Sequence, residues 1–118
     1  MLASLFADVA ADCADAPELA ALAADCQDIA SWMIGASIDD KLAGSTAFCT
    51  MAAVAVAGWQ LQRQAAAVLG EPGPLAAAKP VIAAYFVQHL VPEARGLKAA
   101  ALGGAGLLYA LDAAALTG

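Results

Sequence analysis

The chain has 118 residues, with 5 Lys and Arg against 11 Asp and Glu, which gives a formal net charge of −6. Hydrophobic residues make up 63% of it and charged residues 14%, so the composition excludes a disordered chain and predicts one compact domain that buries apolar faces against a partner. Five basic residues cannot form a cationic stripe along a phosphate backbone, so neither nucleic acid nor a membrane surface is expected as a partner.

Helix is the preferred state of almost every segment. Alanine dominates the sequence, alternation of Val, Ile and Thr is nearly absent, and breaks occur only where Gly and Pro cluster. We therefore predict an all-α fold, a four-helix-bundle-like domain over residues 1–118 with a short extra C-terminal helix. The expected helices cover residues 2–13, 16–34, 40–69, 76–102 and 106–116.

The first two predicted helices each carry one apolar stripe. Asp15 lies in the turn between them and is expected to cap the second helix, with Pro17 in the first turn and Glu18 at the capping-box spacing. The second helix is expected to stop at Gly35 in a left-handed conformation. The two stripes recur three and four residues apart and consist of Leu2, Leu5, Phe6, Val9 and Cys13, then Leu19, Leu22, Cys26, Ile29 and Met33.

The third helix is the longest predicted element. Asp39 and Asp40 are expected to cap its first turn, and Gly70 to end it before a loop rich in Pro and Gly. Residues 42–62 carry no charge, so a transmembrane helix is the alternative, but their many Ala, Ser, Thr and Gln side chains favour a buried helix of a soluble bundle. Two apolar faces predict two neighbours, one face with Phe48, Met51, Ala52, Ala55, Trp59 and Gln62, the other with Val54, Gly58, Leu61, Ala65 and Val68.

The fourth helix is predicted to begin between Leu75 and Pro80, to bend at Pro92 and to continue to about Leu102. The glycines that follow weaken helix formation by about 1 kcal/mol each relative to Ala, which predicts a break before the closing helix. Its two apolar rows are expected to be Ile82, Phe86 and Leu90, and beside them Val81, Tyr85 and His89.

The three cysteines, Cys13, Cys26 and Cys49, form no CxxC pair and predict neither a disulfide framework nor a zinc site. A reducing cytoplasm suits them, and the N-terminal residues lack the basic leader of a secretory signal. Acidic neighbours of Cys13 and Cys26 are expected to raise the pKa of both thiols, which disfavours reactive thiolates. We therefore interpret these two cysteines as small core residues.

No catalytic set can be assembled from the sequence, and no catalytic, cofactor-binding or metal-binding residue is predicted. His89 is the single histidine; we expect it to be partly buried beside a backbone or carboxylate partner, with a ligand or proton-transfer role as the alternative. The Asp39–Asp40 pair is interpreted as a cap rather than a cation site. Trp59 is expected to anchor a core or an interface, and Gly58 to let another backbone approach closely.

Three stretches, in order, carry a resemblance to a known family. They are SWM at residues 31–33, DKLAGSTAF leading into VAVAGWQLQRQA at 40–65, and KPVIAAYFVQHLVPEA at 79–94, followed by GAGLLYAL. The sequence resembles the helical C-terminal extension of a subgroup of bacterial acyl-CoA dehydrogenases. The most specific matches are Gly58 and Trp59 in the third helix, and Lys79, Phe86, His89 and Pro92 in the fourth.

The resemblance implies that the chain belongs with an FAD-dependent acyl-CoA dehydrogenase, whose upstream domains hold the flavin, the CoA site and the catalytic carboxylate. It implies a non-catalytic module with no cofactor of its own, which packs on the dehydrogenase core or on a symmetry mate and in this way serves fatty or short-chain acyl-CoA oxidation. The candidate interface and packing anchors are Gly58, Trp59, Tyr85, Phe86 and His89.

Two other hypotheses are open from the sequence. One is a stand-alone helical bundle that forms a homodimer through its third and fourth helices. The other is a bundle that encloses an apolar ligand, with His89 or Tyr85 as the polar group that orients it.

Overall fold

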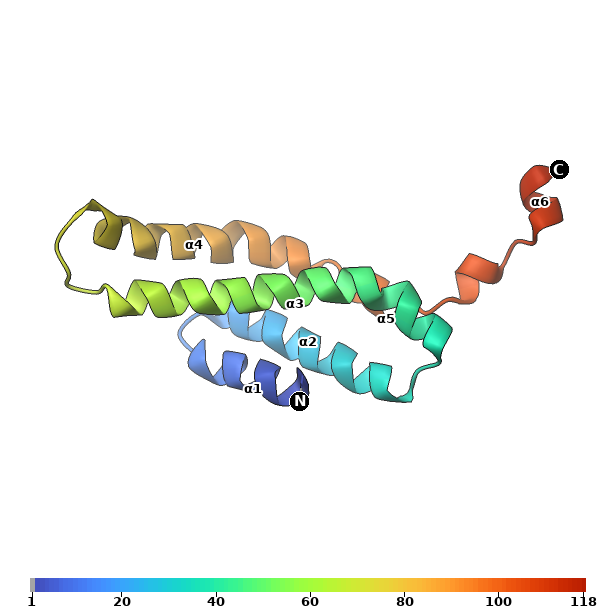
Figure 1. Ribbon diagram of the computed structural model, residues 1–118, viewed down its shortest axis with the longest axis horizontal. Helices are drawn as coiled ribbons and strands as arrows, with labels where there is room; N and C mark the ends of the chain where they lie inside the picture. The colour runs from blue at the N-terminus through green and yellow to red at the C-terminus, as the bar shows by residue number, and fades with distance from the viewer. Residues whose placement is uncertain (1) are drawn as a thin grey trace.

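The computed structural model describes residues 2–118, which form helices joined by turns and short loops and contain no strand (Figure 1). Four long helices make up the bundle: α1 (Leu2–Asp12), α2 (Pro17–Gly35), α3 (Ile38–Ala67) and α4 (Pro74–Arg95). Three short elements follow: α5 (Lys98–Leu102), the 3-10 turn η1 (Gly106–Tyr109) and α6 (Ala113–Thr117). The prediction of an all-α, bundle-like domain with a short C-terminal addition is confirmed.

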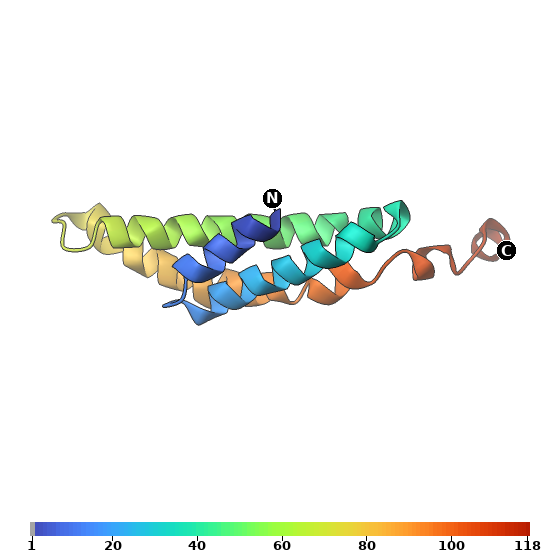
Figure 2. The same ribbon diagram turned by 90° about the horizontal axis from the view of Figure 1, so that it is seen from below.

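The molecule is long and flat, with principal extents of 65 × 30 × 17 Å. α3 runs the length of the bundle and contacts α1, α2, α4 and α5, so it is the element on which the others are assembled (Figures 1 and 2). α1 and α2 pack together on one side of α3, and α4 lies along the other. η1 and α6 lead away beyond the end of the bundle.

The core lies between α2 and its neighbours. The predicted stripes of α1 and α2 are buried nearly as expected, apart from the exposed Leu2, and burial of each large apolar side chain contributes about 1.5–3 kcal/mol. On α3 the face with Phe48, Met51 and Ala55 is buried, whereas the second predicted face is half-buried except at Gly58. The largest fully buried side chains are Phe6, Leu19, Leu22, Ile29, Met51, Val9, Val91, Cys13 and Cys26.

The helices start differently from the prediction. α2 begins after Ala16 with no side-chain cap, so the expected Asp15 cap is wrong. α3 is capped by Ser37, whose hydroxyl accepts a hydrogen bond from the backbone N–H of Asp40 at 3.2 Å. Asp39 and Asp40 therefore lie in the first turn, where their charges complement the helix dipole without capping it.

α2 does not end in the left-handed glycine predicted at Gly35. Gly35 is still helical, and the chain leaves the helix through Ala36, whose φ of −81° and ψ of 154° are extended. The backbone stays extended through Ser37 because the residue that caps α3 needs this conformation. Gly70 does adopt a left-handed φ of 81° after α3, as expected for a C-terminal stop.

The fourth predicted helix is two helices in the structure. α4 passes through both Pro80 and Pro92 and ends at Arg95, and the chain breaks at Gly96 and Leu97, so the predicted unbroken helix to Leu102 is wrong. The backbone N–H of Leu97 donates to the carbonyl three residues earlier at 3.0 Å, which is a tighter turn than an α-helix makes. This turn directs α5 toward α2 and α3. Packing there and the ion pairs of Lys98 with Asp25 and Asp28 compensate for the backbone hydrogen bonds that a continuous helix would have made.

α4 presents a different face to the core from the one predicted. Ala83 and Val91 are buried, whereas Ile82 and Leu90 of the predicted row are exposed and Phe86 is half-buried. Small side chains let α4 lie close to α3, and the rotation that brings them inward places the larger residues outside.

The closing helix predicted over residues 106–116 is split into η1 and α6. Asp112 has an extended backbone, and its carboxylate accepts a hydrogen bond from the N–H of Ala115 at 2.8 Å, so it starts a new helix instead of continuing one. No residue from Gly106 onward is buried.

α3 is the one helix among residues 2–118 that is long and apolar enough to cross a membrane by length and composition. In the bundle it packs against four other helices, which favours the predicted role as a bundle helix. The choice between the two roles stays a prediction.

Candidate functional site

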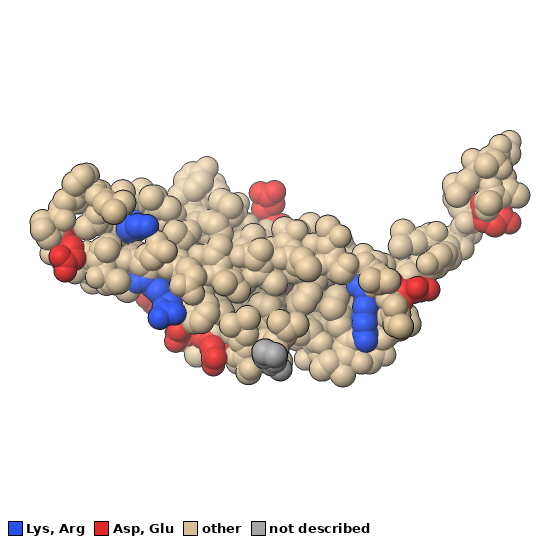
Figure 3. All heavy atoms as spheres, in the orientation of Figure 1, with Lys and Arg blue, Asp and Glu red and all other residues tan. Residues whose placement is uncertain are grey.

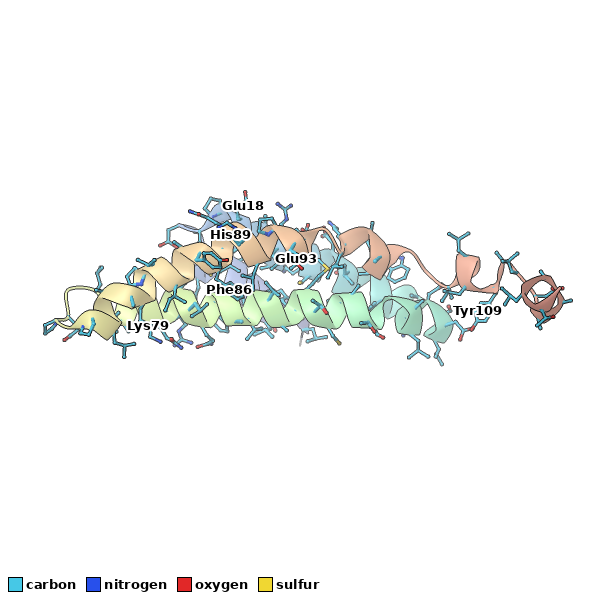
Figure 4. The ribbon with its side chains drawn as sticks, turned by 90° about the horizontal axis from the view of Figure 1, so that it is seen from above. Glu18, Lys79, Phe86, His89, Glu93 and Tyr109 are labelled. Atoms are coloured by element: carbon cyan, nitrogen blue, oxygen red, sulfur yellow. The ribbon has the colours of Figure 1, made fainter. Side chains whose placement is uncertain are left out.

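Two of the five predicted anchors, Gly58 and Phe86, lie where α2, α3 and α4 meet. A Cβ at position 58 would lie 2.8 Å from Cδ1 of Leu19 and 3.2 Å from Cε1 of Phe86. Glycine at this position therefore lets α3 accept a side chain from each neighbouring helix. Figure 4 shows Phe86 on the side of α4 that faces α3. The close approach expected at Gly58 is made by side chains rather than by another backbone.

Trp59 joins α3 to the end of α1. Its indole Nε1 donates a hydrogen bond to Oδ2 of Asp12 at 3.0 Å, and the guanidinium carbon of Arg63 lies 5.4 Å from the ring centroid. These residues border a small pocket of about 160 Å³ together with Asp15 and Gln62. The N–H of the indole is thus hydrogen-bonded within the chain, and Trp59 joins α3 to α1. A role of Trp59 in binding a partner stays a prediction.

Tyr85 and His89 lie outside the core on α4. Their rings stack with centroids 4.4 Å apart at an interplanar angle of 34°, and both side chains are exposed. The expectation that His89 is partly buried beside a backbone or carboxylate group is therefore wrong, because its neighbour is an aromatic ring. Together with the exposed Val81 and Ile82, the stacked pair forms a surface that we name the α4 outer face.

An ion network that the sequence interpretation missed connects α2 to the junction of α4 and α5. Asp25 is only 8% exposed, and its carboxylate accepts hydrogen bonds from Nε of Arg95 at 2.9 Å and from Nζ of Lys98 at 3.1 Å. Lys98 also binds Asp28 at 2.9 Å, and Arg95 lies 3.6 Å from Glu18. A signal was present, since the two aspartates are three residues apart and so are the two basic residues, which places each pair on one helix face.

The network holds its members in their charged forms. Burial by itself would raise the pKa of Asp25, but hydrogen bonds and positive charge from Arg95 and Lys98 keep that pKa below its usual value. Hydrogen bonds to Asp25 and Asp28 raise the pKa of Arg95 and of Lys98 respectively. These groups are paired with one another, which is a structural arrangement rather than one suited to proton transfer.

The thiols of Cys13 and Cys26 are buried in the core. Burial is the main reason that the pKa of both is raised, for Cys26 to about 12, and the carboxylates of Asp12, Asp15 and Asp25 add to the effect. The predicted direction is confirmed, and so is the interpretation of these two residues as core positions. Neither thiol is available as a thiolate at neutral pH.

Two contacts fix the short helix α5 and the chain that follows it against α3. A Cβ at Gly44 would collide with the backbone carbonyl oxygen of Ala101, so only glycine permits this approach. The carboxylate of Asp40 accepts a hydrogen bond from the N–H of Ala105 at 2.8 Å, beyond Gly104 with its φ of 69°. The sequence did not single out Gly44, because a glycine within a helical pattern has no distinctive signature.

An apolar pocket of about 460 Å³, which we name the α1–α3 pocket, lies between the start of α1, the second half of α2 and the first half of α3. Lys41 is its only charged residue, and no ion partner of Lys41 is found in residues 2–118. Neither Tyr85 nor His89 lines this pocket, so the polar group expected for an enclosed apolar ligand is not in place. The lining residues are Leu2, Ala3, Ala30, Met33, Ile34, Lys41 and Phe48.

Comparison with known families decides the classification of the chain. The family model described as acetyl-CoA dehydrogenase C-terminal like matches residues 5–112, which is almost the whole chain. The chain belongs to this family. The match spans α1 to η1 and therefore contains all five predicted anchors and the ion network. The searches of curated proteins and of solved structures found no significant match.

This acetyl-CoA dehydrogenase C-terminal-like domain brings few reactive groups together. Its converging charges are paired with each other, the pKa values of its buried thiols are raised, and His89 lies against the ring of Tyr85. In the part of the chain that the structure describes, no group of three or more His, Cys, Asp or Glu side chains is arranged to hold a metal ion. What the domain does present is apolar surface.

Proposed function

We propose that this chain is a non-catalytic accessory domain of an FAD-dependent acyl-CoA dehydrogenase, and that it packs on the dehydrogenase core or on a symmetry mate. Family membership supports the association with an acyl-CoA dehydrogenase. The observation that carries the packing role is the concentration of exposed apolar side chains on two surfaces.

These surfaces are the α4 outer face and the C-terminal arm, which we define as residues 106–117. Val81, Ile82 and Tyr85 are exposed on the first, and every large apolar side chain is exposed on the second. Single exposed apolar residues are ordinary, whereas contiguous groups mark interaction sites. Figure 3 shows that charged groups are sparse on the visible face of the molecule and that the arm carries a single acidic group.

The flavin belongs to the dehydrogenase core in this proposal, because the described residues do not fit it. FAD requires hydrogen-bond donors for its pyrophosphate and polar contacts for its ring. The α1–α3 pocket offers an apolar lining with the single charge of Lys41, and the pockets beside Trp59 and Leu90 measure about 160 Å³ each. No step of dehydrogenation is assigned to this chain.

Co-purification with a dehydrogenase core tests the proposal. The gene sequence upstream of this chain is expected to encode a flavin-dependent core, and that core, expressed together with the tagged chain, should elute with it and carry the flavin absorbance. The chain by itself should elute colourless and leave acyl-CoA unoxidised. If the isolated chain holds FAD stoichiometrically or oxidises acyl-CoA, or if the core never co-elutes, the proposal is wrong.

Charge substitutions on α4 locate the contact. Ile82→Glu or Tyr85→Glu should reduce the amount of co-eluting core about tenfold or more, because a carboxylate would be buried without a partner in the interface. Gln60→Glu places the same charge on the exposed side of α3, away from the α4 outer face, and should leave co-elution unchanged. Trp59→Ala is expected to act by loosening α1, whose Asp12 it binds, and not by removing a contact with the core.

A further inference from the structure

The C-terminal arm is ordered into helical turns and yet has nothing to pack against. Leu107, Leu108, Tyr109 and Leu111 are between 61% and 90% exposed. Figure 4 shows Tyr109 beyond the end of the bundle, and Figure 1 shows the arm leading away from it. Four large apolar side chains within five residues are costly to leave in water, so we expect another surface to cover the arm.

The base of the arm is a defined joint. Ala105 is buried, its N–H donates to Asp40 at 2.8 Å, and Gly104 has the left-handed φ of 69° that turns the chain outward. Beyond this joint the hydrogen bonds of the arm stay within residues 105–118. The family match continues to residue 112, so the arm's exposed leucines are part of the domain.

The α1–α3 pocket is a matching receptor. Part of its lining comes from the end of α2 and the start of α3, which lie at the end of the bundle from which the arm leaves (Figure 1). Its volume of about 460 Å³ is about three times that of a cavity that holds one benzene ring, and its lining is mostly apolar. Its one charge is Lys41, which has no ion partner in the described chain, and the arm's one charged side chain is Asp112, directly after Leu111. Receptor and arm therefore complement each other in both polarity and charge.

The arm leaves the bundle on the side of α2 opposite to α1 and to the pocket of its own chain (Figures 1 and 2). In Figures 1 and 2, α1 lies on one side of α2 whereas α5 and the arm leave from the opposite side, so the arm would have to reverse around α2 to reach its own pocket. Exchange with a second copy about a two-fold axis would avoid this reversal, and it would be reciprocal.

We infer that two copies of this chain exchange their C-terminal arms, each arm placing Leu107, Leu108 and Leu111 in the α1–α3 pocket of the other with Asp112 beside Lys41. This inference rests on the proposed assembly function and names a second copy as one partner. Stable dimers bury about 1,200–2,000 Å² in total, and a reciprocal exchange would cover two arms and two pockets at once. The α4 outer face stays free for the dehydrogenase core.

The oligomeric state of the full chain, measured by analytical ultracentrifugation over a range of concentrations, is the first test. The wild-type chain should be a dimer, and Leu108→Ser with Leu111→Ser should raise its dissociation constant about 100-fold or more, since two exchanged arms lose two apolar anchors each. Val81→Ser removes an equally exposed apolar side chain from α4 and is the matched control, with no effect expected. A wild-type monomer, or a dimer that tolerates the arm variant, overturns the inference.

Charge reversal distinguishes exchange between copies from an arm that folds back on its own chain. Lys41→Glu and Asp112→Lys should each weaken the dimer about tenfold through like charges in both pockets. A mixture of the two variants should restore the dimer as a heterodimer, because each arm then meets an opposite charge. Asp112→Asn keeps the cap of α6 and isolates the effect of charge. A mixture that stays as weak as its components overturns the exchange.

Core binding is measured separately and keeps the two proposals apart. If the arm variants remain monomeric but still elute with the flavin-containing core, the accessory function stands and the exchange is needed only for the dimer. If the arm becomes protected from proteolysis only when the core is present, the arm docks on the core and the exchange is wrong.

Discussion

The junction of α2, α3 and α5 and the C-terminal arm are built from the same residue types, mainly Ala, Leu and Gly, yet only the first is packed within the chain. At the junction Ala101 lies against Gly44, and Asp25 pairs with Lys98. The arm has more leucines and a glycine at its start, but the space around Gly106 is open. An apolar segment is more stable when it is buried, but composition does not say where. Small residues that face each other, such as Gly44 and Ala101, and paired charges decide which segment packs within the chain.

The largest expected effect on the free energy of unfolding comes from a comparison of a buried leucine in the core with an exposed leucine on the arm. Leu22→Ala should lower the free energy of unfolding by about 3 kcal/mol, because it opens a cavity in the core, whereas Leu108→Ala should change it by less than about 0.5 kcal/mol in the monomer. Urea unfolding followed by circular dichroism, at concentrations below the dimer's dissociation constant, measures both. Equal losses would mean that the arm is packed within its own chain.

An intermediate effect is expected from two glycines. Gly44→Ala should cost about 2 kcal/mol, since the added methyl group collides with the carbonyl of Ala101 and α5 must move away. Gly106→Ala is the matched control, because its Cβ would meet open space, and it should shift stability by less than about 0.5 kcal/mol. The same unfolding assay applies, and a neutral Gly44→Ala would show that α5 is not held where the structure places it.

The smallest effect concerns the ion network and depends on pH. Asp25→Asn should cost about 1–2 kcal/mol at pH 7, since Arg95 and Lys98 keep part of their hydration when the carboxylate is lost. The folded-state pKa of Asp25 lies below its ordinary value of 3.8, so its contribution is complete above about pH 3.8 and is lost as pH falls through the folded pKa.

The stability difference between wild type and Asp25→Asn should therefore be constant from pH 7 to about pH 4 and shrink below pH 3.8. Asp28→Asn removes the exposed partner of Lys98 and should cost less than about 0.5 kcal/mol at pH 7. A stability difference for Asp25→Asn that does not shrink at any pH below 3.8 would show that the network contributes through packing and not through charge.

The apolar stripe of α2 and the end of α3 at Gly70 were predictable from the sequence. The spacing of apolar residues and the left-handed conformation of a glycine each depend on residues within one or two helical turns. Asp15 does not cap α2, and Ser37 rather than Asp39 or Asp40 caps α3, because the direction in which the chain enters each helix selects the cap and is not a local property. The buried row of α4 was missed because Ala83 adds little to a hydrophobic pattern although it permits the closest packing. The five predicted anchors were recognised together, but the structure divides them into Gly58, Trp59 and Phe86 within the bundle and Tyr85 and His89 on its surface.

The sequence by itself determined the helical state of most residues, the order of the long helices and the membership of a family, because helix propensity and motif spacing depend on neighbours within a few positions. Tertiary structure alone decided which rows of α4 face inward, where α4 gives way to α5 and which charges are paired. The bond between Asp25 and Arg95 joins residues 70 positions apart, and only the docking of whole helices brings such groups within hydrogen-bond distance. The same docking leaves the arm outside the bundle, with its large apolar side chains exposed.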